Sequence, residues 1–79
     1  MGKQMPLTRL RAGQKATVAS LPAGRRDLAR LLAFGILPGT DIQILQIFPV
    51  YVLAVGNTRL AIDRKIAAGI LVGVPNTPV

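Results

Sequence analysis

Hydrophobic residues recur along the chain with two different periods, and the periods predict two kinds of element. From residue 41 to 47 they alternate with polar residues, so that Ile42 and Ile44 share one face, which is typical of a strand with one buried side. Shorter hydrophobic runs bounded by glycine or proline predict four further strands, at residues 15–21, 50–55, 59–62 and 70–74. Five short strands joined by tight turns favour a mainly β fold, a small curled antiparallel barrel.

Helical spacing is confined to two short segments. Leu28, Leu31 and Leu32 have the i, i+3, i+4 spacing that places residues on one helical face, and they predict a helix at residues 25–34. A single helical turn is predicted at residues 64–68, after an aspartate that suits an N-cap and before a glycine. Neither segment is long enough to change the mainly β prediction.

The predicted helix ends at a corner whose residues each have a local structural role. Gly35 is expected to stop the helix, because glycine takes a positive φ without a Cβ clash. Ile36 can then fold back on Leu31 or Leu32. Pro38 and Gly39 suit the second and third positions of a type II turn. We interpret Leu31, Gly35, Ile36, Pro38 and Gly39 as a structural signature rather than as a site.

The composition predicts a surface that binds a partner. The chain has 79 residues, enough for one small domain, and 51% of them are hydrophobic. That surplus predicts an exposed apolar patch that serves a partner or self-association. No run reaches the roughly 18 apolar residues of a membrane-spanning helix. The net charge of +7, with no Glu, fits an anionic partner such as nucleic acid, a membrane surface or an acidic protein face, or else serves solubility alone.

The sequence offers few groups for catalysis or metal binding. It contains no Cys and no His, which excludes disulfides and thiol or imidazole chemistry. Its only acidic residues, Asp27, Asp41 and Asp63, lie far apart, whereas acid–base catalysis usually needs a His or paired carboxylates. Ser20, the only serine, has no histidine partner in this chain. We therefore expect neither an enzyme nor a resident metal or cofactor.

Nucleic-acid binding is the first interaction class that remains. Small β-barrels bind RNA or DNA through a basic groove and aromatic stacking platforms. The basic residues are present, but the aromatic ones are only Phe34, Phe48 and Tyr51. We expect Phe34 in the core at the end of the helix, and one of the other two exposed beside a turn. Nucleic acid is therefore the alternative rather than the leading hypothesis.

Protein binding is the second class, and it suits the apolar surplus better. Arg26 and Arg30 lie four residues apart on the polar face of the predicted helix, where they could meet an acidic patch. Phe48, Pro49 and Tyr51 could form an apolar contact at the edge of the barrel. We predict these five residues as partner-binding residues, against the alternative of a solvated helix face and a plain hairpin turn.

Three segments follow one another in the order and spacing of a known family. They are Leu7-x-x-Leu10-x-x-Gly13, then Arg30-Leu31-x-x-Phe34-Gly35-Ile36-x-Pro38-Gly39, then Leu60-Ala61-Ile62 followed by Arg64, Ala67 and Ile70-Leu71-Val72. On these residues the chain resembles the FeoA family, small proteins of bacterial ferrous iron uptake, and the related SH3-like domain at the C-terminus of some iron-responsive repressors. The resemblance covers residues 7–74.

The resemblance implies an SH3-like barrel at residues 7–74, between a flexible lead-in at 1–6 and a frayed tail at 75–79. It also implies a cytoplasmic accessory protein that binds FeoB, the membrane-embedded ferrous iron transporter with a cytoplasmic G-protein domain. Contact with the membrane would then be indirect, through that partner. The segment at 46–50 departs from the family, whose members often have a glycine-containing loop there. The resemblance assigns no docking residues, so those named above rest on charge and exposure.

Overall fold

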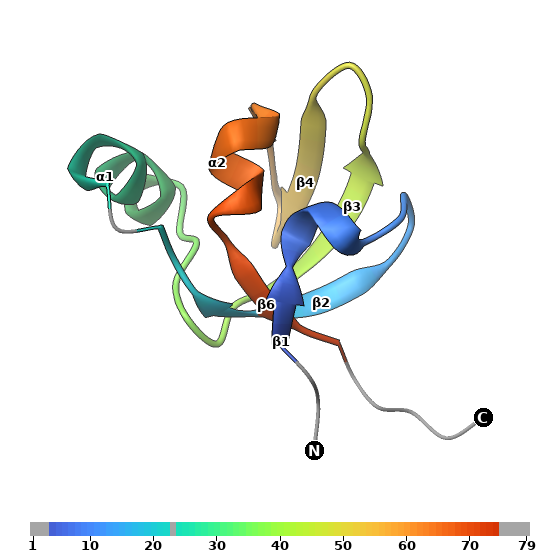
Figure 1. Cartoon of the computed structure of the whole chain (residues 1–79), viewed down its shortest axis with the longest axis horizontal. Coiled ribbons are helices and arrows are strands. Elements are labelled where there is room, and N and C mark those ends of the chain that lie inside the picture. Colours follow the sequence, from blue (N-terminus) through green and yellow to red (C-terminus); the bar gives the residue numbers. More distant parts are fainter. Residues whose placement is uncertain (1–3, 23, 75–79) are drawn as a thin grey trace.

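The computed structural model describes residues 4–22 and 24–74, which form a mainly β domain with short helices (Figure 1). Its elements are β1 (Gln4–Pro6), the 3-10 turn η1 (Leu7–Arg9), β2 (Lys15–Ser20), α1 (Arg25–Ala33), β3 (Asp41–Gln46), β4 (Tyr51–Val55), β5 (Thr58–Ile62), α2 (Arg64–Ala68) and β6 (Leu71–Gly73). The predicted fold class is confirmed, with one helix of nine residues and a second of five.

The strands form one antiparallel sheet in the order β1-β6-β2-β3-β4-β5. Its two edge strands, β1 and β5, are followed directly by η1 and α2, and these two short helices pack against each other. Their contact brings the two edges of the sheet together, so the sheet curls into a small barrel (Figure 1).

One strand was missed, because residues 4–6 were assigned to the lead-in. Gln4 pairs with Gly73 and Pro6 with Leu71, which makes this segment the edge strand β1. An edge strand tolerates Pro6 because only one side of it needs backbone donors. Met5, between them, packs against the core. The remainder of the lead-in and the tail at 75–79 lie outside the described residues.

The core follows the predicted alternation. Ile42 and Ile44 of β3 are buried, while Asp41 on the same strand is exposed. The core contains no buried polar or charged side chain among the described residues. Its largest fully buried side chains come from nearly every part of the chain: Leu7, Val18, Leu31, Ile36, Ile44, Leu53, Ile70 and Val72. The hydrophobic effect on these residues is the main force that holds the barrel together.

The end of α1 has the predicted glycine stop. Gly35 has a φ of +82°, and its N–H donates to the carbonyl of Leu32 at 3.0 Å. The N–H of Ile36 reaches back to the carbonyl of Leu31, also at 3.0 Å. This pair of bonds is the Schellman arrangement, which satisfies carbonyls that the helix leaves without partners. Both Leu31 and Ile36 are buried, as expected for the apolar contact that accompanies it.

The turn that follows is fastened to the sheet. Thr40 donates its N–H to the carbonyl of Leu37 at 2.9 Å, and Gly39 has a φ of +93°, as the predicted type II turn requires. Val18 of β2 exchanges two backbone bonds with this turn: its carbonyl accepts from Gly39 at 2.7 Å, and its N–H donates to Thr40 at 2.8 Å. The corner is therefore part of the rigid frame that positions α1.

Candidate functional site

Helix α1 stands to one side of the barrel and is anchored mainly through its C-terminal end (Figure 1). Leu31 is the only buried residue among the α1 side chains that the structure describes. Leu28 is half-buried, and Leu32 is 43% exposed. The three leucines thus share a helical face as predicted, but only one of them reaches the core. Much of the helix surface is left open to solvent.

The open side of α1 combines arginines with small and apolar residues. Arg26 and Arg30 are exposed one turn apart, as predicted. Going around the helix from them, Ala29 and Ala33 come next and Leu32 follows, because successive residues are offset by a fixed rotation. All five side chains are exposed. We call these five residues the α1 surface.

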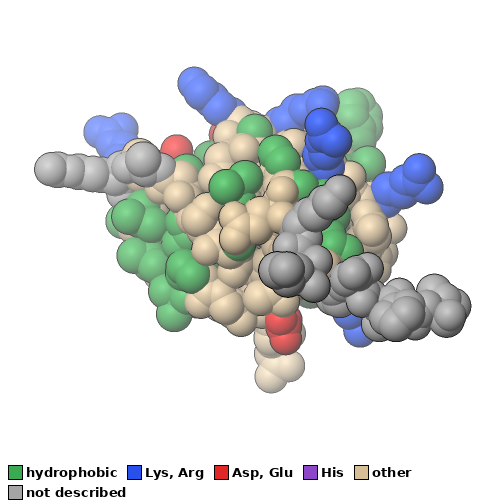
Figure 2. All heavy atoms as spheres, turned by 60° about the horizontal axis from the view of Figure 1, so that its bottom comes forward, with side chains coloured by type: hydrophobic (Ala, Val, Ile, Leu, Met, Phe, Trp, Pro, Cys, Tyr) green, Lys and Arg blue, Asp and Glu red, His purple; other side chains and the backbone are tan. Residues whose placement is uncertain are grey.

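The apolar part of the α1 surface continues past the end of the helix. Leu37 is exposed in the turn, and Figure 2 shows hydrophobic side chains gathered on the side of the molecule where α1 lies. Phe34 is 43% exposed, so its predicted place in the core is wrong. It is the C-cap residue of α1, and the reversal at Gly35 turns the next residue, Ile36, inward in its place.

The second exposed surface is the connection between β3 and β4, at residues 47–50, which we call the β3–β4 tip. Phe48 is 82% exposed, the most of any large hydrophobic residue that the structure describes. Ile47, Pro49 and Val50 beside it are exposed as well. Four consecutive apolar residues therefore face solvent. A monomeric protein rarely leaves such a patch without a use.

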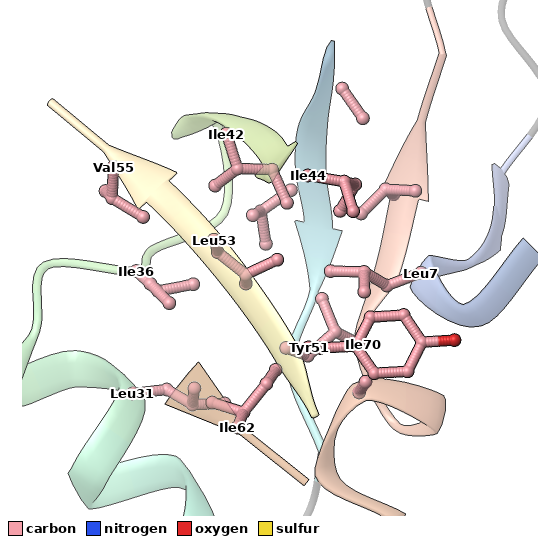
Figure 3. Packing of buried hydrophobic residues seen from close by; sticks show 14 of the residues in the cluster. Leu7, Leu31, Ile36, Ile42, Ile44, Tyr51, Leu53, Val55, Ile62 and Ile70 are labelled. Atoms are coloured by element: carbon pink, nitrogen blue, oxygen red, sulfur yellow. The ribbon is translucent and has the colours of Figure 1, made fainter. Parts of the chain in front are cut away.

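Tyr51, predicted with Phe48 and Pro49 as a contact residue, lies elsewhere. It is the first residue of β4, it pairs with Ile62 of β5, and only 5% of its surface is exposed. Figure 3 shows its ring within the cluster of buried hydrophobic residues. Of the two aromatic residues that flank the turn, Phe48 is the exposed one, and Tyr51 is part of the core that supports it.

The predicted partner-binding residues therefore do not form one continuous face. Arg26 and Arg30 lie on α1, whereas Phe48 and Pro49 lie at the β3–β4 tip, and α2 stands between these two elements in Figure 1. The same separation bears on nucleic-acid binding. With Tyr51 in the core, the exposed rings of the described residues are those at the end of α1 and at the tip, and they form no continuous stacking platform.

Polar side chains of β2 and β3 line part of a surface hollow. This shallow hollow of about 420 Å³ is lined in part by Lys15, Thr17, Asp41 and Gln43. The Thr17 hydroxyl donates to Asp41 Oδ1 at 2.8 Å, so this carboxylate already has a structural partner. Within residues 4–22 and 24–74, no group of three or more His, Cys, Asp or Glu residues could hold a metal ion. None of the helices in these residues reaches the length and hydrophobicity of a membrane span.

Comparison with known proteins identifies a family. Residues 5–74 match the family model of the FeoA domain. A crystal structure of an iron uptake regulatory protein, FeoA, is 28% identical over 89% of this chain and 95% of its own length, with a TM-score of 0.79. The solution structure of the FeoA protein from Chlorobium tepidum is 29% identical over 89% of this chain and 70% of its own, with a TM-score of 0.83.

The same fold also occurs as part of a larger protein. IdeR from T. acidophilum is 25% identical over 91% of this chain, with a TM-score of 0.86, but the match spans only 34% of the IdeR chain. No curated protein matches the sequence. The chain thus corresponds to nearly the whole of one FeoA structure and to about a third of IdeR.

Proposed function

The chain belongs to the FeoA family, and on that premise we propose that it is a non-catalytic accessory protein of ferrous iron transport that binds the cytoplasmic part of a FeoB-type membrane GTPase transporter. The observation that carries this proposal is the family match over residues 5–74, which includes the whole barrel except Gln4. It is supported by structural similarity to a protein described as an iron uptake regulator. The proposed site of action is the cytoplasm, at the inner face of the membrane that holds the transporter.

We assign the transporter contact to the α1 surface. The helix presents two exposed guanidinium groups, from Arg26 and Arg30, beside the exposed side chain of Leu32. The small side chains of Ala29 and Ala33 lie between them, so a partner backbone can approach closely. The partner expected for this arrangement is an acidic, partly apolar segment, because opposite charges steer association and fix the register of a contact.

Charge reversal on α1 tests the docking surface. The full chain is used to capture the cytoplasmic domain of the transporter, and affinity is compared for the parent, Arg30→Glu, and Arg26→Glu combined with Arg30→Glu. We expect the double variant to bind about tenfold more weakly or worse, because the contact becomes repulsive. Arg59→Glu makes the same charge change at an exposed position on β5, and should bind within about twofold of the parent.

Iron uptake tests the function itself. Ferrous iron uptake is measured under iron-poor anaerobic conditions in a strain that lacks this protein, then with the parent or the double α1 variant restored. The proposal predicts reduced or misregulated uptake without the protein, and restoration by the parent but not by the double variant. Uptake that is the same with and without the protein would overturn the proposed function.

A further inference from the structure

The β3–β4 tip projects beyond the paired part of its hairpin. The last ladder pair of the two strands joins Gln46 to Val52, so the four residues between Gln46 and Tyr51 extend past the sheet, and Figure 1 shows their connection rising above the strands. Phe48 lies within this projection with 82% of its surface exposed. The tip is therefore an apolar projection.

Basic side chains flank the tip on one side through α2. The pairing of Tyr51 with Ile62 places the end of β5 beside the foot of the tip. The chain then enters α2, whose first two residues are Arg64 and Lys65. Both are exposed. Two cations thus stand on the β5 side of the tip.

A second pair of basic side chains comes from η1, which packs against α2, and from the loop that follows η1. The N–H of Gly13 donates to the carbonyl of Ile44 at 2.6 Å, and the N–H of Ile44 donates to the carbonyl of Gln14 at 2.9 Å. These bonds hold the loop against the end of β3 from which the tip extends. Arg11 in this loop and Arg9 at the end of η1 are both exposed.

The charge around the tip is strongly unbalanced. The only acidic residue at this end is Asp63, and its carboxylate already accepts a hydrogen bond from the N–H of Ile66 at 2.8 Å, as the cap of α2. The other two acidic residues of the chain, Asp27 and Asp41, lie on α1 and at the opposite end of β3. Four cations and one carboxylate therefore lie on the elements next to this apolar projection.

An apolar projection with a group of cations near its base matches the surface of an anionic bilayer. The apolar side chain leaves water for the boundary of the acyl chains, while the cations stay at the level of the lipid phosphates. A flat anionic surface can meet the cations of α2 and of the loop after η1 at once, whereas a protein partner would need a pocket for Phe48 with acidic groups beside it. We propose that the β3–β4 tip binds directly to anionic lipid membranes, with Phe48 inserted and the flanking basic residues on the phosphates.

This contact is independent of the transporter and differs from the indirect membrane contact that the family resemblance implies. It would hold the protein at the membrane while the α1 surface, on another side of the molecule, stays available to a protein partner. Because the vesicle experiments contain only the protein and lipid, their failure would leave the proposed function in iron transport untouched.

Insertion of the tip can be observed directly, because the chain contains no Trp. Phe48→Trp places a single fluorophore at the tip. The full chain is mixed with vesicles of phosphatidylcholine alone, or with about a third of the lipid replaced by phosphatidylglycerol to give an anionic surface. We expect a blue shift of the emission, and quenching by brominated acyl chains, with the anionic vesicles and much less of either with the neutral ones.

Affinity for the same anionic vesicles is then compared among variants by co-sedimentation. Phe48→Ser should bind about tenfold more weakly, since it removes the inserted apolar side chain. Arg64→Glu should also bind about tenfold more weakly, since it reverses a charge beside the tip. Arg59→Glu, at the far end of β5, has the same formal charge and should bind within about twofold of the parent.

Three results would overturn the proposal. The first is that the anionic vesicles bind Phe48→Ser as tightly as the parent. The second is that Arg64→Glu and Arg59→Glu lose the same affinity, which would show a general charge effect. The third is that the parent does not bind the anionic vesicles, while Phe48→Ser abolishes capture of the transporter domain or dissociates a self-associated form, because the tip would then contact protein. Unfolding curves of each variant confirm that it is folded.

Discussion

The corner at residues 31–40 and the β3–β4 tip both reverse the chain direction and both expose hydrophobic side chains, yet they are built differently. At the corner, buried Leu31 and Ile36 anchor the segment, and backbone bonds to Val18 tie it to β2. At the tip, four apolar residues extend past the last ladder pair and Phe48 contacts mainly solvent. The exposed residues of the corner belong to a segment that buried side chains and backbone bonds hold in place. The exposed residues of the tip belong to a segment without such anchors.

The difference separates two kinds of hydrophobic residue that composition treats alike. A substitution inside the corner should act first on stability, and any loss of binding should follow from unfolding. A substitution at the tip should act on binding and leave stability almost unchanged. The predictions below test this separation, from the largest expected change in the free energy of unfolding to the smallest.

Truncation of Leu31 or of its neighbour Leu32 in α1 should give the largest difference in the free energy of unfolding between two variants. Leu31→Ala removes a buried side chain and leaves a cavity, so the free energy of unfolding should fall by about 2–5 kcal/mol. Leu32→Ala, at an exposed position of the same helix, should change it by about 0.5 kcal/mol or less. Urea unfolding of both variants measures the difference. Equal losses would mean that α1 packs on the barrel through a different face.

Replacement of Gly35, the glycine that ends α1, should have the second-largest effect on the free energy of unfolding. Gly35→Val forces a β-branched residue to a φ of +82°, which should cost about 1–3 kcal/mol. For a domain of this size, that corresponds to a fall in Tm of about 5–15 °C. Gly35→Asn should cost less, because Asn tolerates positive φ better than other residues. A Gly35→Val variant with the parent Tm but no partner binding would show that the corner is a site rather than a joint.

Removal of the Thr40 hydroxyl should have a smaller effect on the free energy of unfolding. Its Oγ1 accepts a hydrogen bond from the N–H of Leu37 at 3.1 Å and lies 3.4 Å from the carbonyl oxygen of Gly35, to which it donates. Thr40→Val keeps the shape and removes these bonds, so it should cost about 1 kcal/mol. Thr58→Val, the same change at an exposed position on β5, serves as the control and should be close to neutral.

The corner could be predicted from the sequence because its rules are local. Gly35, Pro38 and Gly39 each require a particular backbone conformation that depends on near neighbours in the chain. The strand at residues 4–6 could not be predicted in this way, because it exists only through its pairing with β6, far away in the sequence. Phe34 was wrongly predicted to lie in the core for a related reason. How the chain reverses at Gly35 decides whether Phe34 or Ile36 turns inward.

The choice between Phe48 and Tyr51 shows the same limit at the candidate site. Every residue from 50 to 55 is apolar, so periodicity gives no sign of which side of β4 faces inward. The register of Tyr51 with Ile62 settles it and buries the tyrosine. Their charge correctly predicted that Arg26 and Arg30 of α1 are exposed. Nothing in the sequence indicated that these arginines lie apart from the tip.

Phe48→Ser should change the stability least, and it tests most directly whether the tip differs from the corner. Because 82% of the side chain is already exposed, its loss removes little buried area, and the free energy of unfolding should stay within about 0.5 kcal/mol of the parent. Under our proposal the same substitution weakens binding to anionic vesicles. Leu31→Ala should show the reverse, with a large loss of stability and normal vesicle affinity per folded molecule. If Phe48→Ser instead destabilises the fold, the tip is a structural turn like the corner, and the two regions do not differ in kind.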